Sequence, residues 1–349
     1  MDELAAVIAA YFPPGRTVTT RELAGGNINR SFLVDDGKRP VVVQRLNPEV
    51  FADPQRVVAN FAVLASHLSG KNFLVARPIA TLTGAECFQA ADGAIWRAQS
   101  YIEEHTPGAR ANPESIGGTL ARFHRLTADL PPAKLSPAIP GFHDTSGYLQ
   151  AADRALTAAP AKIQEAAALR WCRDMIERFR PMANYFAREV AAGGISRQVT
   201  HGDPKRENFI CDKNGQALGL FDLDTVGPGL VAHDLGDCLR SLANPAGEET
   251  DLETVRFDLD ICRAFLRGYR REYAEAGEEA PPLDIFAGTL TIALELGLRR
   301  LTDHLSGDRY FRVRRPGDNL RLAMVQFRLA ELIAANEQKI RAMAAVRDK

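Results

Sequence analysis

Two aspartates and an asparagine are spaced along one stretch of the chain in a way that could hold a metal ion. Asp203 and Asn208 stand just before a short apolar run and a turn at residues 213–215, and Asp222 ends the apolar run that follows. Paired strands joined by such a turn lie about 4.8 Å apart, so we expect Asn208 and Asp222 to become neighbours. Carboxylate and amide oxygens are ligands that Mg²⁺ accepts when nucleotide phosphates supply others. The stretch therefore predicts a magnesium nucleotide site.

The same residue types fit phosphoryl transfer, in which the protein supplies mainly alignment and charge neutralisation. Asp203 would accept the proton of the acceptor hydroxyl, while Asn208 and Asp222 would bind the Mg²⁺ that bridges the phosphates of ATP. Lys205 could reach the γ-phosphate, and Asp224 could serve a second metal ion or a metal-bound water. An aspartate and an asparagine at this spacing are also common in loops, because both favour turns. Their combination with a hairpin and a second aspartate is more specific to a kinase catalytic loop.

The elements that must position these residues change in character near residue 100. Extended segments with one helix precede it: strands are predicted at 16–23, 30–34, 41–46, 85–90 and 94–102, and a helix at 55–68. Helices dominate after it and are predicted at 113–126, 164–191, 253–276, 284–305 and 319–345. We therefore expect an α+β fold of two lobes, a β-rich lobe over residues 1–102 and a larger helical lobe over 103–349, with the active-site cleft between them.

A glycine-rich turn follows the first predicted strand, where it could approach a nucleotide. Gly25 and Gly26 are followed by Asn27 and Asn29. Glycines permit close approach of the backbone to phosphate groups. A hairpin turn with two glycines is otherwise ordinary, so the turn is a nucleotide-binding candidate only in combination with the catalytic segment.

Composition and charge argue against several classes of function. The 349 residues carry a formal net charge of −1, so no overall field would recruit nucleic acid or an anionic membrane. No stretch offers the roughly 18–20 apolar residues of a membrane span. The five cysteines form no Cys-x-x-Cys pair, which argues against zinc and redox motifs. Reduced thiols and the lack of a signal peptide predict a cytoplasmic protein; nothing in the sequence indicates an oligomeric state.

Together these residues resemble the aminoglycoside phosphotransferase/choline kinase superfamily, whose members have a protein-kinase-like fold and a comparable His-Gly-Asp catalytic loop. The closest resemblance is to the N-acetylhexosamine 1-kinase branch. It is carried by segments spread over nearly the whole chain, at 22–29, 43–47, 50–51, 53–54, 142–145, 222–229, 301–311, 319–320 and 326–327.

The resemblance implies that the protein uses ATP and Mg²⁺ to phosphorylate the anomeric hydroxyl of N-acetylglucosamine or N-acetylgalactosamine. It implies Asp203 as the base, with Arg299 and Tyr310 as contacts to the sugar, the small-molecule partner of the protein. It implies Asn208 and Asp222 as the metal ligands. It also implies that adenine lies against the backbone of Ser100, Tyr101 and Ile102.

The sequence departs from the pattern of this branch at three places. The loop at 201–205 reads His-Gly-Asp-Pro-Lys where His-Asn-Asp-Thr-Lys is expected, and Pro204 removes a hydroxyl group and a backbone donor beside the base. The strand lysine that commonly holds the α- and β-phosphates is replaced by Gln44 or Arg45, either of which could point inward. The helix that follows has no glutamate to pair with such a lysine, and Asn60 is its nearest polar candidate.

Two further aspartates, Asp234 and Asp237, follow the stretch that carries Asp222 and Asp224, and structural roles are predicted for them. Asp234 is predicted to brace the catalytic loop rather than to touch a ligand. Asp237 is interpreted as a charge at a helix N-terminus, with a substrate contact as the alternative.

Two alternatives to a sugar 1-kinase stay open. One is another small-molecule kinase of the superfamily, acting on choline or a similar amino alcohol, an aminoglycoside or another sugar. The arginine-rich segment at 299–321 favours a neutral or anionic acceptor over a cationic one. The other alternative is an inactive nucleotide-binding pseudokinase, which the missing strand lysine suggests. The intact set of Asp203, Asn208 and Asp222 favours an enzyme.

Overall fold

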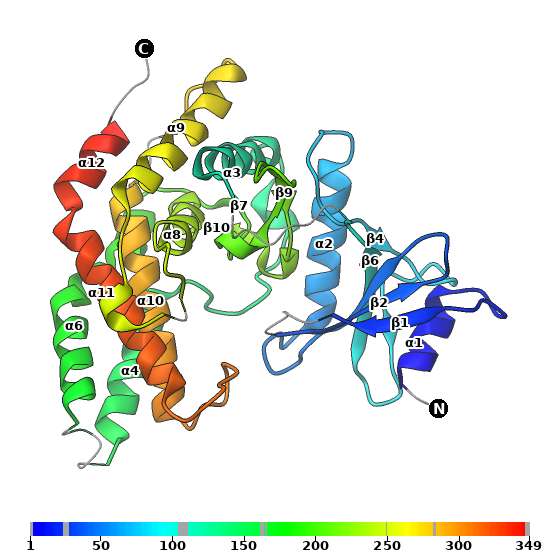
Figure 1. The fold of residues 1–349 in the computed structure, drawn as a ribbon, viewed down its shortest axis with the longest axis horizontal. Coiled ribbons are helices and arrows are strands. Elements are labelled where there is room, and N and C mark those ends of the chain that lie inside the picture. Colours follow the sequence, from blue (N-terminus) through cyan, green and yellow to red (C-terminus); the bar gives the residue numbers. More distant parts are fainter. Residues whose placement is uncertain are drawn as a thin grey trace.

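The protein consists of a small lobe built on an antiparallel sheet and a larger helical lobe, as its computed structural model shows (Figure 1). The structure describes residues 3–23, 28–103, 111–160, 164, 166–248, 250–281 and 284–345. The expected two-lobed α+β architecture is confirmed. No helix in the described ranges is both long and apolar enough to cross a lipid bilayer, and the five cysteines are all unpaired.

The small lobe is organised around a six-stranded sheet with strand order β1-β2-β3-β6-β4, in which β5 pairs with β6. Its strands are β1 (Thr19–Glu22), β2 (Arg30–Asp35), β3 (Val41–Arg45), β4 (Pro78–Ile79), β5 (Phe88–Gln89) and β6 (Ile95–Ser100). Alternation along β3 sends Val41, Val43 and Arg45 to one face of the sheet and Val42 and Gln44 to the other.

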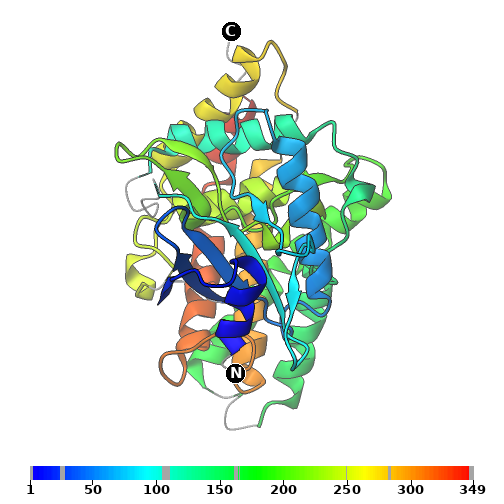
Figure 2. The same ribbon diagram turned by 90° about the vertical axis from the view of Figure 1, so that its right-hand side faces the viewer.

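Helix α1 (Glu3–Tyr11) covers the first of these faces (Figure 2). Val7 and Tyr11 pack there with Val43 and Trp96 in a small apolar core, and Tyr11 Oη donates to the carbonyl of Trp96 at 3.1 Å. This helix was not predicted from the sequence, because nine residues give too few turns for a clear apolar period. The opposite face of the sheet is left to line a cavity.

Helix α2 (Pro54–Leu68) connects the small lobe to the large one. Pro54 occupies its first position, and the side chain of Asp53 accepts a backbone N–H of its first turn, so the start of the helix is well defined. Its buried residues include Phe61 and Leu64, which belong to the same apolar core as the helices of the large lobe.

The large lobe is mainly helical and holds two short strand pairs. Its helices are α3 (Pro113–Thr127), α4 (Thr145–Ala158), α6 (Ala167–Ala183), α7 (Tyr185–Ala191), α8 (Val231–Leu242), α9 (Leu259–Glu275), α10 (Ile285–Leu305), α11 (Asp318–Ala335) and α12 (Glu337–Ala345). The strand pairs are β7 (Gln198–Thr200) with β10 (Gly227–Gly229), and β8 (Phe209–Cys211) with β9 (Ala217–Leu220). Single 3-10 turns are η1 (Pro132–Lys134), η2 (Arg206–Asn208), η3 (Leu223–Thr225) and η4 (Leu252–Thr254).

Glycines let two pairs of these helices pack with their backbones in direct contact. A Cβ at Gly268 on α9 would lie 1.8 Å from a carbonyl oxygen of α3, and one at Gly117 on α3 would lie 2.0 Å from a carbonyl oxygen of α9. A Cβ at Gly236 on α8 would lie 2.3 Å from the carbonyl oxygen of Gly288 on α10, and one at Gly288 would lie 2.2 Å from the carbonyl oxygen of Ala232 on α8. No larger residue fits at these crossings without backbone movement. The crossing of α8 and α10 fixes the position of α8, which carries Asp234, the residue expected to brace the catalytic loop.

Most predicted elements are present, and the differences have local causes. The predicted helix at 164–191 is two helices, α6 and α7, and Pro181, which has no backbone N–H, lies in the last turn of α6. The helix predicted from residue 253 begins at Leu259, where the side chain of Asp258 accepts two backbone N–H groups of the first turn. The last predicted helix is divided into α11 and α12, and β5 is shorter than expected.

Candidate active site

Asp234, in the first turn of α8, holds the catalytic loop by its backbone. Its Oδ2 accepts the N–H of His201 and its Oδ1 the N–H of Gly202, each at 2.8 Å. The Nε2 of His124 on α3 lies 3.0 Å from Oδ2. Burial opposes ionisation, but the bonds from His124 and the loop lower the pKa of Asp234 below its ordinary value. The prediction that Asp234 braces the loop is confirmed.

His201 ties this loop to the strand end that carries Asp222. The backbone N–H of Asp203 donates to Nδ1 of His201 at 3.3 Å, which places the proton of the neutral ring on Nε2. Nε2 then donates to the carbonyl of Phe221 at 2.7 Å. Burial lowers the pKa of His201, which keeps the ring neutral. Since the ring is fully buried, it positions the loop rather than contacting a substrate.

Gly202 gives the loop a backbone conformation that few other residues adopt. Its φ is +84°, and a Cβ there would lie 2.7 Å from the carbonyl oxygen of Thr225. Glycine adopts this region of φ without steric cost, and asparagine tolerates it better than most residues do. The glycine is therefore compatible with a loop in which an asparagine was expected.

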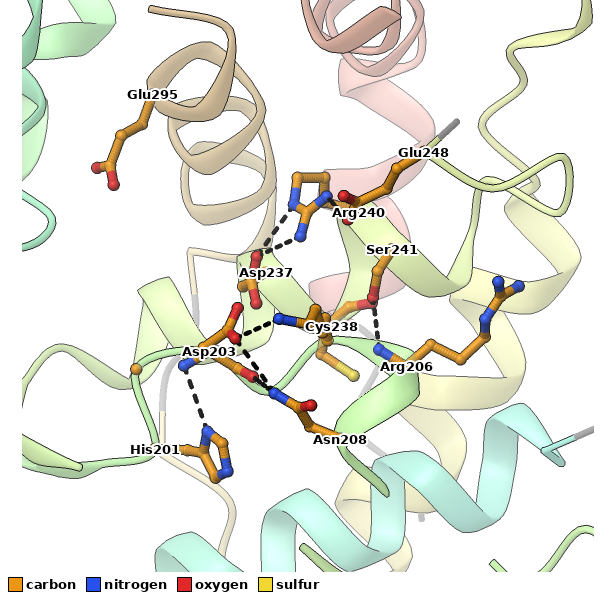
Figure 3. A network of polar contacts seen from close by, with 12 residues as sticks. His201, Asp203, Arg206, Asn208, Asp237, Cys238, Arg240, Ser241, Glu248 and Glu295 are labelled. Carbon is orange, nitrogen blue, oxygen red and sulfur yellow. Dashed lines mark hydrogen bonds and ion pairs between the residues drawn. The ribbon is translucent and has the colours of Figure 1, made fainter. Parts of the chain in front are cut away.

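Asp203 lies on this loop at the edge of a cavity and is ionised. Burial raises its pKa, but the ion pair between its Oδ2 and Lys205 outweighs burial, so the pKa of Asp203 lies below its ordinary value. Asn208 Nδ2 donates to the Asp203 carbonyl at 2.7 Å and to its Oδ2 at 3.2 Å (Figure 3). The side chain is 28% exposed. A charged carboxylate in this position can accept a proton from a bound hydroxyl group.

Asn208 and Asp222 are neighbours across the hairpin of β8 and β9, as predicted. The N–H of Phe221 donates to the carbonyl of Asn208 at 2.7 Å, directly beyond the ladder pair of Phe209 and Leu220. The Asp222 carboxylate makes no hydrogen bond to the described part of the chain. Burial and the nearby carboxylates raise the pKa of Asp222 to about 7, although Lys205 opposes that shift.

This arrangement fits a divalent cation. A carboxylate that faces the cavity, lies near other carboxylates and accepts no hydrogen bond is stabilised by a bound positive charge. The Nδ2 of Asn208 is bonded to Asp203, which leaves the amide oxygen available as a ligand. The described residues contain no cluster of three histidine, cysteine, aspartate or glutamate side chains placed to hold a metal ion. Phosphates and water would therefore complete the coordination, as is usual for Mg²⁺.

A cavity of about 780 Å³ between the two lobes contains most of the predicted site residues. Those that line it are Asn29, Gln44, Ser100, Tyr101, Ile102, Asp203, Lys205, Asn208, Asp222 and Asp224. The predicted nucleotide contacts Gly25, Gly26 and Asn27 lie outside the described residues. The volume is that of a pocket for a small ligand or cofactor.

Gln44, and not Arg45, faces this cavity in place of the expected strand lysine. Arg45 points to the opposite face of the sheet, where its Nε pairs with Glu3 of α1 at 3.2 Å. Gln44 Oε1 accepts hydrogen bonds from Nε and Nη2 of Arg97 at 3.1 and 2.9 Å. Arg97 is the register partner of Gln44 on β6 and also lines the cavity. No role for Arg97 was predicted from the sequence, although strand alternation places it on the same face as Gln99.

Asp224 and Asn60 are both engaged with other parts of the protein. The two carboxylate oxygens of Asp224 accept hydrogen bonds from Arg97 and Asn29. Its role at a second metal ion stays a prediction. Asn60 donates to two backbone carbonyls at 2.7 and 3.0 Å, so it does not replace the missing helix glutamate.

Arg299 and Tyr310 lie together, but neither lines this cavity in the structure. Nη2 of Arg299 donates to Oη of Tyr310 at 3.2 Å. The guanidinium lies 5.3–5.5 Å from the centres of four aromatic rings, those of Phe142, Tyr148, Tyr310 and Phe311. The predicted role of this pair as sugar contacts stays a prediction.

Glu295 connects that pair to the catalytic loop, a link that was not predicted. Its Oε1 lies 4.0 Å from Nη1 of Arg299 and 3.0 Å from Nδ1 of His143. Nε2 of His143 lies 2.8 Å from the carbonyl oxygen of Gly202. Burial opposes protonation of His143, but Glu295 and that carbonyl raise its pKa above the ordinary value. The spacing of Glu295 and Arg299, one helical turn apart, was the available sequence signal.

Asp237 is not at a helix N-terminus, so that interpretation was wrong. It lies in the middle of α8 and pairs with Arg240 at 2.7 Å. Arg240 also binds Glu248, a residue of the cavity (Figure 3). Burial raises the pKa of Asp237 to about 6, although Arg240 opposes that shift. The second oxygen of Asp237, Oδ2, is buried without a hydrogen-bond partner in the described ranges.

Known proteins share this sequence pattern and this fold. The profile of a family described as the phosphotransferase enzyme family matches residues 19–274. An aminoglycoside phosphotransferase from Alicyclobacillus acidocaldarius is 18% identical, with 97% of this chain and 96% of that chain covered and a TM-score of 0.66. An amicoumacin kinase in complex with AMP-PNP and Ca²⁺ is 17% identical, with coverage of 95% and 94% and a TM-score of 0.61. A choline kinase from Cryptosporidium parvum is 12% identical, with coverage of 97% and 96% and a TM-score of 0.62. The expected kinase-like fold is confirmed.

Proposed function

The chain belongs to the phosphotransferase enzyme family, and we propose that it transfers the γ-phosphoryl group of ATP, bound with Mg²⁺, to a hydroxyl group of a small molecule. The observation that carries this proposal is the convergence of Asp203, Asn208 and Asp222 in one cavity. Phosphoryl transfer requires a proton acceptor and a metal site at this proximity.

Each of these residues has a role that follows from its surroundings. Asp203 is ionised and accepts the proton of the acceptor hydroxyl while the hydroxyl oxygen bonds to the γ-phosphorus and the bond from that phosphorus to the departing ADP breaks. Asn208 and Asp222 would hold Mg²⁺, and the ion would supply positive charge to the phosphates. Burial opposes the charge on Lys205, but Asp203 and Asp222 raise its pKa, so a cation is available to the transferred group. Adenine lies beside the chain that continues from the end of β6 at Ser100.

The acceptor we propose is an N-acetylhexosamine, phosphorylated on its anomeric hydroxyl. The support comes from the sequence segments at 22–29, 142–145 and 301–311. The pairing of Arg299 with Tyr310 is compatible with it, because an arginine fork and a phenol suit the hydroxyl and acetamide oxygens of such a sugar.

A cationic acceptor, such as an amino alcohol or an aminoglycoside, is the alternative, and one observation favours it. Oδ2 of Asp237 is buried and has no hydrogen-bond partner in the part of the chain that the structure describes, and an ammonium group would satisfy it. Against it, Arg240 already balances the charge of this carboxylate.

Replacement of the base tests the proposed chemistry. We expect Asp203→Asn to lower kcat by at least about 100-fold, because general base catalysis contributes roughly 10²- to 10⁴-fold. The dissociation constant for Mg·ATP should stay within about threefold of wild type, since Asn208 and Asp222 are intact. Turnover is followed by ADP release and nucleotide binding by calorimetry. Asp260→Asn, at an 88% exposed side chain on α9, is the control, and full turnover by Asp203→Asn would remove Asp203 as the base.

A screen of acceptors then decides between the sugar and the amine. Wild-type protein and Asp203→Asn are compared on N-acetylhexosamines, other sugars, amino alcohols and aminoglycosides. Phosphorus NMR of the product shows whether the phosphate is on an anomeric carbon. Tight Mg·ATP binding without turnover of any acceptor would favour the inactive pseudokinase.

A further inference from the structure

The cavity must bind a triphosphate without the strand lysine that commonly does so. The side chain of β3 that faces the cavity is the neutral Gln44. The cationic side chains that line the cavity within the described ranges are Arg21, Arg97 and Lys205. Lys205, paired with the base, is the cation proposed above for the transferred group, and Arg21 lies on the exposed edge strand β1. The third cation of the cavity is Arg97, and its contacts indicate its role.

Arg97 is buried and held in place along one side of its guanidinium. Only 3% of the residue is exposed. Nε and Nη2 donate to Gln44, and Nη2 also donates to Asp224. Nη1 is buried and has no hydrogen-bond partner within the described residues. A charged group with unpaired N–H donors is costly inside a protein unless a ligand completes its bonding.

We propose that Arg97 is the phosphate-binding cation of this site, displaced from β3 to the adjacent position on β6. The inference rests on the proposed function, because it names the group that holds the phosphates of ATP. Neighbouring strands are about 4.8 Å apart, and an arginine side chain is long enough to span that difference. Its fork-shaped guanidinium also suits phosphate oxygens.

Gln44 and Asp224 would then be positioning residues for Arg97. Gln44 fixes the guanidinium through two hydrogen bonds, and Asp224 supplies the opposite charge that a helix glutamate would supply to a lysine. Residues 222–224 thus carry both Asp224, which holds the phosphate-binding arginine in place, and Asp222, which is proposed to bind the metal ion. Since both oxygens of Asp224 are bonded, Asp222 is the carboxylate left for the metal ion.

The competing explanation is that Arg97 and Asp224 form an ion pair of structural value only. The two explanations differ in how binding depends on phosphate. Calorimetric titration of Mg·ATP and of adenosine therefore tests them on the folded, full-length protein. We expect Arg97→Gln to weaken Mg·ATP binding about 10- to 100-fold, as loss of a charge-assisted pair does, and to change adenosine binding less than about twofold.

A matched control removes the same charge from the other face of the sheet. Arg45→Gln breaks the ion pair with Glu3 but leaves the cavity unchanged, so Mg·ATP binding should stay within about twofold of wild type. Arg97→Lys keeps the charge but loses the fork, and should fall between wild type and Arg97→Gln. Equal Mg·ATP binding by wild type and Arg97→Gln, or an equal loss for ATP and adenosine, would overturn the inference.

Relocation of the cation gives a second readout that does not depend on the stability of Arg97→Gln. The double variant Gln44→Lys/Arg97→Gln returns a positive charge to β3 beside Asp224, so it compensates that buried carboxylate. We expect it to recover at least about tenfold of the lost Mg·ATP affinity relative to Arg97→Gln, or to bind Mg·ATP within about tenfold of wild type if the single variant does not fold. If a folded double variant bound Mg·ATP no more tightly than adenosine, a phosphate-binding role for Arg97 would be contradicted. Failure of the wild-type protein to bind Mg·ATP would instead contradict the proposed function.

Discussion

At the scale of single residues, four carboxylates near the catalytic loop differ in charge state because their neighbours differ. Lys205 keeps the pKa of Asp203 low, and His124 with the loop amides does the same for Asp234, although burial opposes both. Burial raises the pKa of Asp222 to about 7 and that of Asp237 to about 6. A charged base thus lies beside a carboxylate that a cation would stabilise, the combination that phosphoryl transfer needs.

Asp234 offers a test of how much the loop depends on its support. We expect Asp234→Asn to lower the free energy of unfolding by about 1–3 kcal/mol, because an amide cannot accept the N–H groups of both His201 and Gly202. The catalytic rate should fall as well, since Asp203 follows these residues directly. Urea denaturation and an ADP-release assay measure the two effects. Wild-type stability in Asp234→Asn would show that the loop is held by other contacts.

Prediction from the sequence succeeded for residues that are close together in the chain and failed for pairs that are far apart. Asp203, Asn208 and Asp222 lie in one stretch of chain, on the catalytic loop and at the ends of the hairpin that follows it, so a spacing rule brings them together. Arg97 and Asp224 are 127 positions apart, and their contact depends on how the two lobes meet. The choice between Gln44 and Arg45 needed the pleat of β3 against α1, which a single sequence does not fix.

At the scale of elements, the crossing of α3 and α9 depends on glycines that a larger side chain would disrupt. We expect Gly268→Ala to lower the free energy of unfolding by about 1–3 kcal/mol, because its Cβ would lie 1.8 Å from a backbone oxygen. Gly118→Ala is the matched control on the same interface, since its nearest contact would be an ordinary 3.5 Å. It should be neutral or stabilising by up to about 1 kcal/mol, as alanine favours a helix. Denaturant midpoints compare the two, and equal effects would show that the crossing can shift.

Element types were predictable because long segments carry a clear apolar period, but their ends and breaks were not. The break before α7 and the late start of α9 depend on backbone hydrogen bonding near Pro181 and Asp258. Helix α1 owes its stability to the sheet on which it packs, through Val7 and Tyr11. A boundary between the lobes at residue 102 stays a prediction.

At the scale of the whole molecule, the two lobes are joined by contacts that involve residues lining the cavity. The backbone N–H of Leu220 on β9 donates to the carbonyl of Leu74 at 3.1 Å. Asn29 of the small lobe donates to Asp224 of the large lobe. Phe61 on α2 belongs to the core of the large lobe. A ligand in the cavity would therefore contact and stabilise both lobes together.

We therefore expect both lobes to unfold in one transition and Mg·ATP to raise the midpoint temperature of that transition. A ligand at about 100 times its dissociation constant stabilises the native state by about 2.7 kcal/mol. Because Asp222 is the carboxylate proposed to hold the metal ion, Asp222→Asn should lose most of the difference between Mg·ATP and ATP with EDTA, while Asp203→Asn should retain it. Differential scanning calorimetry separates these cases. Two transitions, with only one shifted by Mg·ATP, would show that the lobes unfold independently and that the nucleotide is held by one of them.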